Sequence, residues 1–223
     1  MRPEDIVDAL SGVRLPNVFN PYADICEVYD RTDAVLARRS NLTMFLRAAV
    51  KLGVDTLWMG RDLGYRGGRR TGLALTDERH LPEMSKVYHG SKATRATSGP
   101  ALAERTAAEI WAAISALSIP PFLWNVFPFH PYEAGNPFSN RRFTAKELAT
   151  VHEINCELIS SLGIRRIVAI GQDAAYYSAS FGVDVVAVRH PSYGGTNEFR
   201  AGIDALYPGK RKRNVSAEQV SLF

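Results

Sequence analysis

The alternation of short apolar segments with amphipathic ones limits the fold of this chain more than any other feature. Four mostly apolar segments of five or six residues are bounded by glycine, proline or polar residues: Val54–Met59, Phe122–Val126, Arg165–Ile170 and Val183–Val188. Short apolar runs separated by helical patterns are typical of parallel strands that are covered on both faces. We therefore expect an α/β fold with a central four-stranded parallel sheet flanked by helices.

Helical periodicity between these segments agrees with that expectation. Residues 31–50 and 101–117 carry apolar side chains three and four positions apart, and Gly53 ends the first of these patterns. Thr144-Ala-Lys-Glu147 has the spacing of a capping box, which predicts a helix from there to about residue 162. Shorter helices are expected over residues 173–181 and 198–206, whereas residues 60–100 show little periodicity.

Length and composition fit a single domain spanning residues 1–223. The chain has 223 residues and 46% of them are hydrophobic, which is enough for one full core. We expect this core over about residues 30–207 and a basic tail over 208–223, where Lys210–Arg213 is a run of four basic residues. The first residues are polar and acidic, unlike a signal peptide, and no apolar run approaches the ~20 residues of a membrane helix.

The cysteine content restricts the cofactors that the chain can hold. Cys26 and Cys156 are the only cysteines and lie far apart in the sequence. Two thiolates are too few for an iron–sulfur cluster or a four-thiolate zinc site, and the five histidines lack metal-ligand spacing. A disulfide framework is excluded as well, so we expect no metal, no cofactor and a reducing, cytoplasmic setting.

The basic residues are mostly arginine. Lys and Arg number 27 against 23 Asp and Glu, and 21 of the 27 are arginine. The planar guanidinium group suits bidentate contacts with phosphate or carboxylate groups. A modest net charge of +4 is ordinary for an enzyme, so this composition only indicates an anionic partner without identifying it.

Polar residues follow the predicted strands at the points where these strands end. The three segments concerned are Gly60–Tyr65, Trp124–Pro131 and His190–Gly195. Ligands of open parallel sheets bind beyond the carboxyl ends of the strands. We therefore expect Asp62, Asn125 and His190 to lie along one edge of the sheet, where a carboxylate, an amide and an imidazole form a candidate reactive group.

Each of these residues also has a simpler interpretation. Asp62 can cap a turn, Asn125 can satisfy backbone groups at a strand end, and His190 can mark an ordinary strand exit. Other site motifs do not match: the phosphate-loop and dinucleotide patterns and the Gly-x-Ser-x-Gly elbow are absent from the sequence.

Taken together, three motifs resemble the uracil-DNA glycosylase superfamily. Gly60-Arg-Asp62 is followed in register by Gly72-Leu-Ala-Leu75, the apolar run Phe122-Leu-Trp-Asn125 ends in asparagine, and His190-Pro-Ser192 comes near the C-terminus. The order and approximate spacing agree with the family over roughly residues 50–200. The resemblance implies the same four-stranded fold, and the two cysteines point away from the iron–sulfur branches of the family.

The resemblance implies a role for each of the three residues. Asp62 would stabilise the positive charge that develops on the sugar and orient water, and His190 would bind the O2 atom of the departing base. The Asn125 amide, with one donor and one acceptor, would read O4 and N3–H of uracil. Because a base inside a duplex cannot reach such a pocket, the nucleotide must flip out of the helix.

Further residues follow from the same resemblance. The expected base-binding residues besides Asn125 are Gly60, Tyr65, Leu75 and Phe127, where Phe127 is the preferred stacking partner. The expected DNA-binding residues are Arg61, Arg66, Arg69, Arg70, Ser192, Tyr193 and Gly194. The sequence departs from the family at Gly64, where the family has a tyrosine that excludes thymine, and at Leu75, where it has the stacking phenylalanine. Tyr193 stands at the position of the wedge leucine.

The resulting hypothesis is a monomeric, monofunctional DNA glycosylase that excises uracil from single- or double-stranded DNA and leaves an abasic site. None of the six lysines lies in the three motifs, so a strand-cleaving lysine nucleophile is not expected. Three alternatives remain open. They are excision of another deaminated or mismatched base such as hypoxanthine, a non-catalytic DNA-binding module of the same fold, and an α/β enzyme acting on a small molecule.

Overall fold

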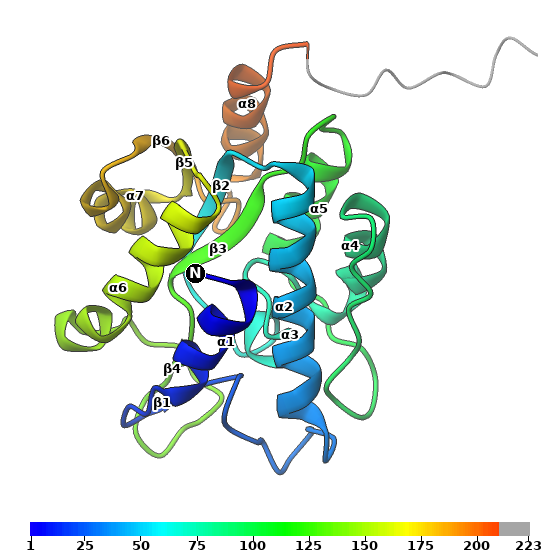
Figure 1. The fold of residues 1–223 in the computed structure, drawn as a ribbon, viewed down its shortest axis with the longest axis vertical. Helices are drawn as coiled ribbons and strands as arrows, with labels where there is room; N and C mark the ends of the chain where they lie inside the picture. Colours follow the sequence, from blue (N-terminus) through cyan, green and yellow to red (C-terminus); the bar gives the residue numbers. More distant parts are fainter. Residues whose placement is uncertain (210–223) are drawn as a thin grey trace, which may run out of the picture.

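The computed structural model describes residues 1–209 of the chain and centres on a parallel sheet. The sheet order is β3-β2-β5-β6, and each neighbouring pair is parallel (Figure 1). The strands are β2 (Thr56–Asp62), β3 (Phe122–Phe127), β5 (Arg166–Ile170) and β6 (Asp184–Val188). The predicted α/β fold with a four-stranded parallel sheet is confirmed. The basic run expected at residues 210–213 lies outside the described residues.

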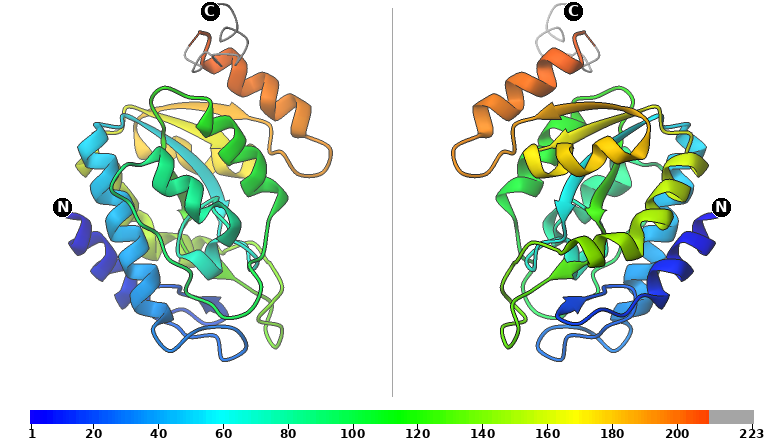
Figure 2. Two further views of the ribbon diagram at one scale, coloured as in Figure 1. Left: turned by 90° about the vertical axis from the view of Figure 1, so that its right-hand side faces the viewer. Right: turned by 90° about the vertical axis from the view of Figure 1, so that its left-hand side faces the viewer.

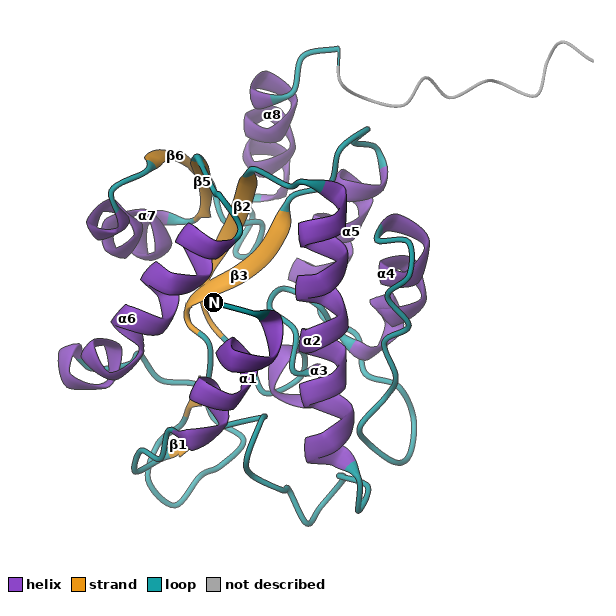
Figure 3. Cartoon of the chain, viewed as in Figure 1, coloured by secondary structure: helices purple, strands orange, loops and turns teal. Residues whose placement is uncertain are grey.

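Helices surround this sheet, and a small second sheet lies near the carboxyl ends of the strands (Figure 3). The longer helices are α1 (Pro3–Gly12), α2 (Ala34–Leu52), α5 (Arg105–Ser115), α6 (Ala145–Ser161) and α8 (Thr196–Leu206). The shorter ones are α3 (Gly68–Thr71), α4 (Leu81–Val87) and α7 (Gln172–Ser178), with 3-10 turns at Glu78–His80 and Ala179–Phe181. The small antiparallel sheet pairs β1 (Val18–Phe19) with β4 (His130–Pro131).

Both faces of the sheet are covered, as its continuous apolar strands require. Helices α6 and α7 lie on one face, and α5 and α8 lie on the other (Figure 2). Successive residues of β2 show this division: the Trp58 ring meets Phe199 of α8 edge-on, whereas Met59 contacts the Ser178 hydroxyl at the end of α7. In the described part of the chain, no helix has the length and apolar character needed to cross a membrane.

The local signals for helix ends are confirmed. The Thr144 hydroxyl accepts a hydrogen bond from the backbone N–H of Glu147 at 3.2 Å, and the Glu147 carboxylate accepts one from the Thr144 N–H at 2.7 Å. This is the predicted capping box at the start of α6. Gly53 ends α2 with a φ of 62°, a left-handed conformation that glycine adopts without steric cost.

Two regions hold more structure than the sequence pattern indicates. Helix α1 buries Ile6, Val7 and Leu10, so the core also includes residues before position 30. Residues 60–100 contain α3, α4 and a 3-10 turn. Their periodicity is hidden because short helices offer few apolar positions and because this region buries charged side chains such as Arg70 and Glu78.

Strand β2 is longer than predicted at its carboxyl end. The apolar run stops at Met59, but the strand continues through Gly60 and Arg61 to Asp62. Asp62 pairs in register with Phe127 of β3, and Gly60 pairs with Asn125. Asp62 is therefore held by the sheet rather than by a loose loop.

Candidate functional site

Gly60 of β2 and Asn125 of β3 lie side by side near the carboxyl ends of these strands, where the candidate site is located. Asn125 is 1% exposed, and its side chain lies across Gly60 on the neighbouring strand: a methyl group added at Gly60 would stand 2.4 Å from Asn125 Oδ1. Both Oδ1 and Nδ2 of Asn125 are buried and have no hydrogen-bond partner among residues 1–209. A buried amide without partners costs stability, about 1–3 kcal/mol, so this group is prepared for a ligand that the fold itself does not supply.

Leu75 closes the space beside this amide. Its Cδ2 atom would lie 3.0 Å from a Cβ at Gly60. Leu75 also has a φ of 54°, which is uncommon for a bulky residue. Backbone strain of this kind collects at binding sites, where surrounding structure enforces it. The structure thus brings Gly60, Leu75 and Asn125 together.

Asp62 lies at the end of β2, and its side chain is 10% exposed. Arg61 Nε donates to Asp62 Oδ2 at 2.6 Å, and Arg61 Nη1 donates to Asp173 Oδ2 at 3.0 Å. Burial raises the pKa of Asp62 above its ordinary value, the charge of Asp173 adds to this rise, and Arg61 opposes it. Arg61 was expected to contact DNA, but the structure gives it two carboxylate partners within the protein.

His190 follows β6 and occupies the same edge of the sheet. Its Nδ1 atom accepts a hydrogen bond from the Ser192 backbone N–H at 3.2 Å, so the proton of the neutral ring is on Nε2. Burial lowers the pKa of His190, and the charges of Arg189 and Arg61 lower it further. The ring is therefore neutral at pH 7 and presents Nε2–H as a donor.

A glycine after β5 leaves room for this imidazole. Gly171 has a φ of 93°, and a Cβ there would stand 3.1 Å from His190 Cβ. Strand β5 lies between β2 and β6. Because Gly171 directly after β5 has no side chain, His190 can approach the residues at the end of β2. The influence of Arg61 on the pKa values of both Asp62 and His190 is consistent with this proximity.

The start of helix α5 contacts the loop that follows Asp62 and the loop that follows β6. A Cβ at Gly64 would stand 2.8 Å from Glu104 Oε1, so Glu104 packs against the loop after Asp62. Thr106 Oγ1 and Ser192 Oγ are 3.1 Å apart, which ties α5 to the loop after His190. Burial raises the pKa of Glu104 to about 7. The sequence patterns did not identify Glu104 or Asp173, because neither belongs to a motif.

Two expected base-stacking residues have partners elsewhere. Phe127 is completely buried and its ring packs against Phe129 and Phe143. Tyr65 lies toward the loop after β4, where its N–H donates to Asn140 Oδ1 at 3.3 Å. Both are near the site in sequence, but Phe127 packs in the core and the Tyr65 hydroxyl accepts a hydrogen bond from Arg66 Nε at 2.9 Å.

The prediction that Arg69 and Arg70 contact DNA is corrected, because both side chains are buried. Arg69 is 3% exposed and donates to Nδ1 of His130 at 3.0 Å, a histidine whose pKa burial lowers to about 4. Arg70 is 5% exposed and its Nε lies 3.0 Å from Glu78 Oε2. Both guanidinium groups therefore bind partners in the protein interior and not at the surface. Arg66, by contrast, is exposed.

The loop after His190 projects an aromatic side chain into solvent. Tyr193 is 97% exposed, with a φ of 52°, and it is followed by Gly194 with a φ of 81°. Ser192 is held by its contact with Thr106. An exposed tyrosine on a loop of unusual backbone conformation is a candidate contact for a partner.

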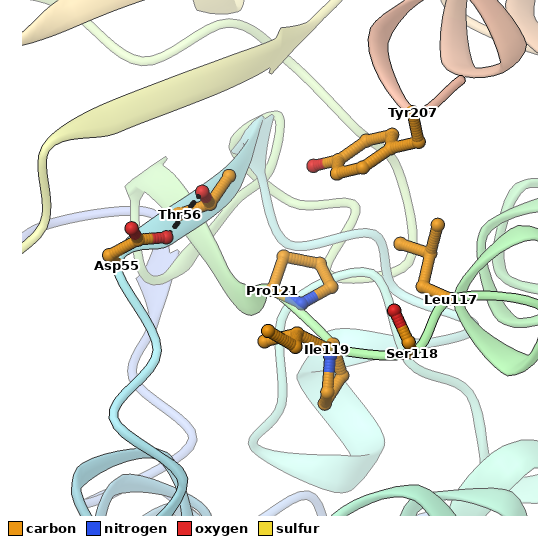
Figure 4. Close-up of a pocket in the computed structure, with 8 residues that line it drawn as sticks. Asp55, Thr56, Leu117, Ser118, Ile119, Pro121 and Tyr207 are labelled. Atoms are coloured by element: carbon orange, nitrogen blue, oxygen red, sulfur yellow. Dashed lines mark hydrogen bonds between the residues drawn. The ribbon is translucent and has the colours of Figure 1, made fainter. Parts of the chain in front are cut away.

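The structure has one surface cavity at the amino ends of the strands and another beside the small sheet near their carboxyl ends. One of about 130 Å³ is lined by Thr56 and Tyr207, among others (Figure 4), and Thr56 begins the strand that Asp62 ends. Another, of about 670 Å³, lies beside β1 and is lined by Phe19 and Phe138. Among residues 1–209, no three His, Cys, Asp or Glu side chains are grouped to hold a metal ion.

Comparison with known proteins gives a structural match. No protein-family model matches the sequence, and no curated protein sequence matches it. The fold is similar to the crystal structure of wild-type Pedobacter heparinus SMUG2, with a TM-score of 0.62 and 18% sequence identity over 92% of this chain and 95% of that chain. At this identity the likeness establishes the shared fold.

Proposed function

We propose that this protein is a DNA glycosylase that excises uracil. The observation that carries the proposal is the buried amide of Asn125, whose oxygen and nitrogen both lack partners beside Gly60. An acceptor and a donor at one position match the N3–H and O4 of uracil. Asp62 and His190 lie at the same edge of the sheet, which supplies the groups needed at the sugar and at the base.

The chemistry divides between these two residues. Breaking the C1′–N1 bond leaves positive charge on the sugar and an electron pair on N1 of the base. The Asp62 carboxylate stabilises the sugar cation and orients a water molecule, whose oxygen bonds to C1′ while its proton is released to solvent or to the carboxylate. Arg61 occupies Oδ2 of Asp62, so Oδ1 is the oxygen that faces this task.

His190 acts at the departing base. Its neutral ring donates Nε2–H to O2 of uracil, and this hydrogen bond strengthens as negative charge develops on the base. A neutral donor suits an anionic leaving group because no proton has to be lost before the next turnover. The lowered pKa of His190 is consistent with this role.

Contacts with DNA are assigned to the exposed residues of the two loops. These are Arg66 after β2 and Tyr193 and Gly194 after β6, and the half-buried Ser192 beside them completes the set. Tyr193 is the proposed wedge that fills the space left by the flipped nucleotide. Flipping costs a few kcal/mol, and these contacts offset that cost.

The structural neighbour supports the same class of reaction. Pedobacter heparinus SMUG2 is a glycosylase of the uracil-DNA glycosylase superfamily, and its fold spans nearly all of this chain. The motif resemblance carried by Gly60–Asp62, Asn125 and His190–Ser192 falls on the carboxyl edge of the shared sheet.

The test is a base-release assay. A labelled oligonucleotide with one uracil is incubated with the protein in EDTA and then heated in alkali, and cleavage is expected at the uracil position. Asp62→Asn should lower the single-turnover rate by about 100-fold or more. Asp55→Asn makes the same chemical change at the start of β2 and should leave the rate unchanged. An intact oligonucleotide with wild-type protein would contradict the proposal.

A second substrate is favoured by one observation. Gly64 stands where the related motif has a tyrosine that excludes thymine, and Leu75 stands where it has the stacking phenylalanine. This difference favours excision of another deaminated base, such as hypoxanthine. Single-turnover rates on a panel of damaged bases distinguish the two, and uracil as the fastest substrate rejects this second candidate.

A further inference from the structure

Arg61 forms a bridge between two carboxylates at the end of β2. Its Nε donates to Asp62 Oδ2 at 2.6 Å, and its Nη1 donates to Asp173 Oδ2 at 3.0 Å. Asp173 stands in the first turn of α7 and also pairs with Arg142 Nη2 at 3.2 Å. The chain of contacts therefore runs from an exposed arginine through Asp173 and Arg61 to the proposed catalytic carboxylate.

The Arg61 side chain turns away from the direction that its position in the strand would normally give it. Adjacent residues of a strand point to opposite faces, so Arg61 and Asp62 would normally diverge. Here the guanidinium group turns back at the strand end and reaches both acids with two separate nitrogens, a geometry that its rigid fork permits. The Arg61 side chain is 31% exposed, so it is partly shielded from solvent.

We propose that Arg61 is a positioning residue that fixes the Asp62 carboxylate through Oδ2, and that Asp173 anchors Arg61 in this orientation. The consequence for catalysis rests on the proposed function, whereas the positioning itself does not. The sequence predicted that Arg61 binds a DNA phosphate. Phosphate binding and positioning of Asp62 predict different effects when Arg61 is substituted.

The charged groups around Asp62 determine what each substitution should do. Arg61 and Arg141 lower the pKa of Asp62, and Asp173 and burial raise it. Arg141 is itself paired with Glu147. Removing Arg61 should therefore raise the pKa of Asp62. Removing the charge of Asp173 should lower this pKa if Asp173 acts only through its field, and raise it if Asp173 holds Arg61 in place.

The experiment is a carbon-13 NMR titration of the Asp62 carboxyl group in wild type, Arg61→Gln, Arg61→Lys and Asp173→Asn. We expect the midpoint to rise in Arg61→Gln by about one pH unit, with partial recovery in Arg61→Lys. We also expect it to rise in Asp173→Asn. Arg142→Gln is the matched control, because Arg142 pairs with Asp173 without touching Asp62, and its midpoint should stay near that of wild type.

A second readout separates positioning from phosphate binding. If base release is observed, the acid limb of the pH–rate profile should move upward in Arg61→Gln, and below the new midpoint the rate should fall about 10-fold per pH unit. The dependence of DNA affinity on salt should not change, whereas a lost phosphate contact would reduce the slope of log K against log salt by ~0.9.

The outcomes distinguish this inference from the proposed function. A lower midpoint in Asp173→Asn, an unchanged midpoint in Arg61→Gln, or a reduced salt slope with an unchanged pH profile overturns the positioning role. An equal shift in Arg142→Gln also overturns it, because a general field would then suffice. Wild-type protein that releases no base contradicts the function instead, and the NMR titration still tests Arg61.

Discussion

Two buried asparagines on neighbouring elements show how a single residue can be reserved for a ligand. Asn155 of α6 accepts a hydrogen bond from Trp124 Nε1 at 2.9 Å and donates one to the Val126 carbonyl at 2.8 Å. Asn125, equally buried, has no such partners in the part of the chain that the structure describes. The same side chain therefore stabilises the fold at one position and lowers stability at the other.

This contrast gives a prediction for Asn125→Leu. Replacing the unpartnered amide by an apolar group of similar shape should raise the free energy of unfolding by about 1 kcal/mol. The same change should lower base release by about 100-fold, because the proposed base-reading group is lost. Urea denaturation and the oligonucleotide assay measure the two effects.

Asn155→Leu is the matched control for that experiment. It leaves the Trp124 N–H and the Val126 carbonyl without partners, so the free energy of unfolding should fall by about 1–3 kcal/mol. If both substitutions destabilise the protein equally, Asn125 is a structural residue rather than a reserved one.

At the scale of elements, strands were easier to predict than the connections between them. The runs ending at Met59 and Val126 located β2 and β3 because buried parallel strands are continuously apolar. The motif that ends β2 was readable because Asp62 and Asn125 lie at the carboxyl ends of neighbouring strands. The first turn of α5 was not, because its contacts with Gly64 and Ser192 depend on tertiary packing.

The buried arginines of α3 show the same limit. Arg69 and Arg70 look like a solvated basic loop in the sequence, yet each lies against an aromatic ring, Phe19 and Tyr29 respectively, with 4.0 Å between the guanidinium carbon and the ring centroid. A run of charged residues predicts exposed side chains when the groups that pair with them are not known. Here the groups that pair with Arg69 and Arg70 come from segments distant in the sequence.

The first turn of α5 leads to a prediction about pH. Burial raises the pKa of Glu104 from 4.5 to about 7, so the stability contributed by its neutral form is complete below pH 4.5 and is lost as the pH rises through 7. Glu104→Gln should therefore match wild type near pH 4.5 and be more stable by up to about 3 kcal/mol at pH 8. Thermal denaturation at both pH values tests this.

Glu109→Gln provides the comparison on the same helix. Glu109 pairs with Arg200, whose side chain is 59% exposed, and its substitution should change stability by less than about 1 kcal/mol at either pH. A similar gain at pH 8 in both variants would show that the effect comes from net charge rather than from the buried carboxyl.

At the scale of the whole molecule, the two ends of the sheet carry different groups of residues. The carboxyl ends hold Asp62, Asn125 and His190, whereas the amino ends lie near Tyr207 and the start of β2 (Figure 4). Strand β2 has seven residues, which places these ends roughly 20 Å apart. Changes at the amino ends should therefore alter stability without altering catalysis.

Tyr207→Phe tests this separation. Trp58 Nε1 donates to Tyr207 Oη at 2.9 Å, and Trp58 is completely buried. Loss of the hydroxyl leaves the indole N–H without its acceptor, so the free energy of unfolding should fall by about 1–2 kcal/mol, with an unchanged rate of base release. Tyr176→Phe removes a hydroxyl from a side chain that is 77% exposed and should change neither quantity.

The close approach of Asn125 to Gly60 also restricts how this protein can acquire a new substrate. Any side chain at position 60 would displace the amide, and a larger residue at position 125 would meet the main chain of β2. Selection or engineering for another base therefore has little freedom in the strands. Variation has to enter through the loop, at Gly64 and Leu75, where neighbours are side chains that can be exchanged together. Under the proposed function, libraries that vary positions 64, 75 and 104 together and keep both strands fixed are the route to altered base preference.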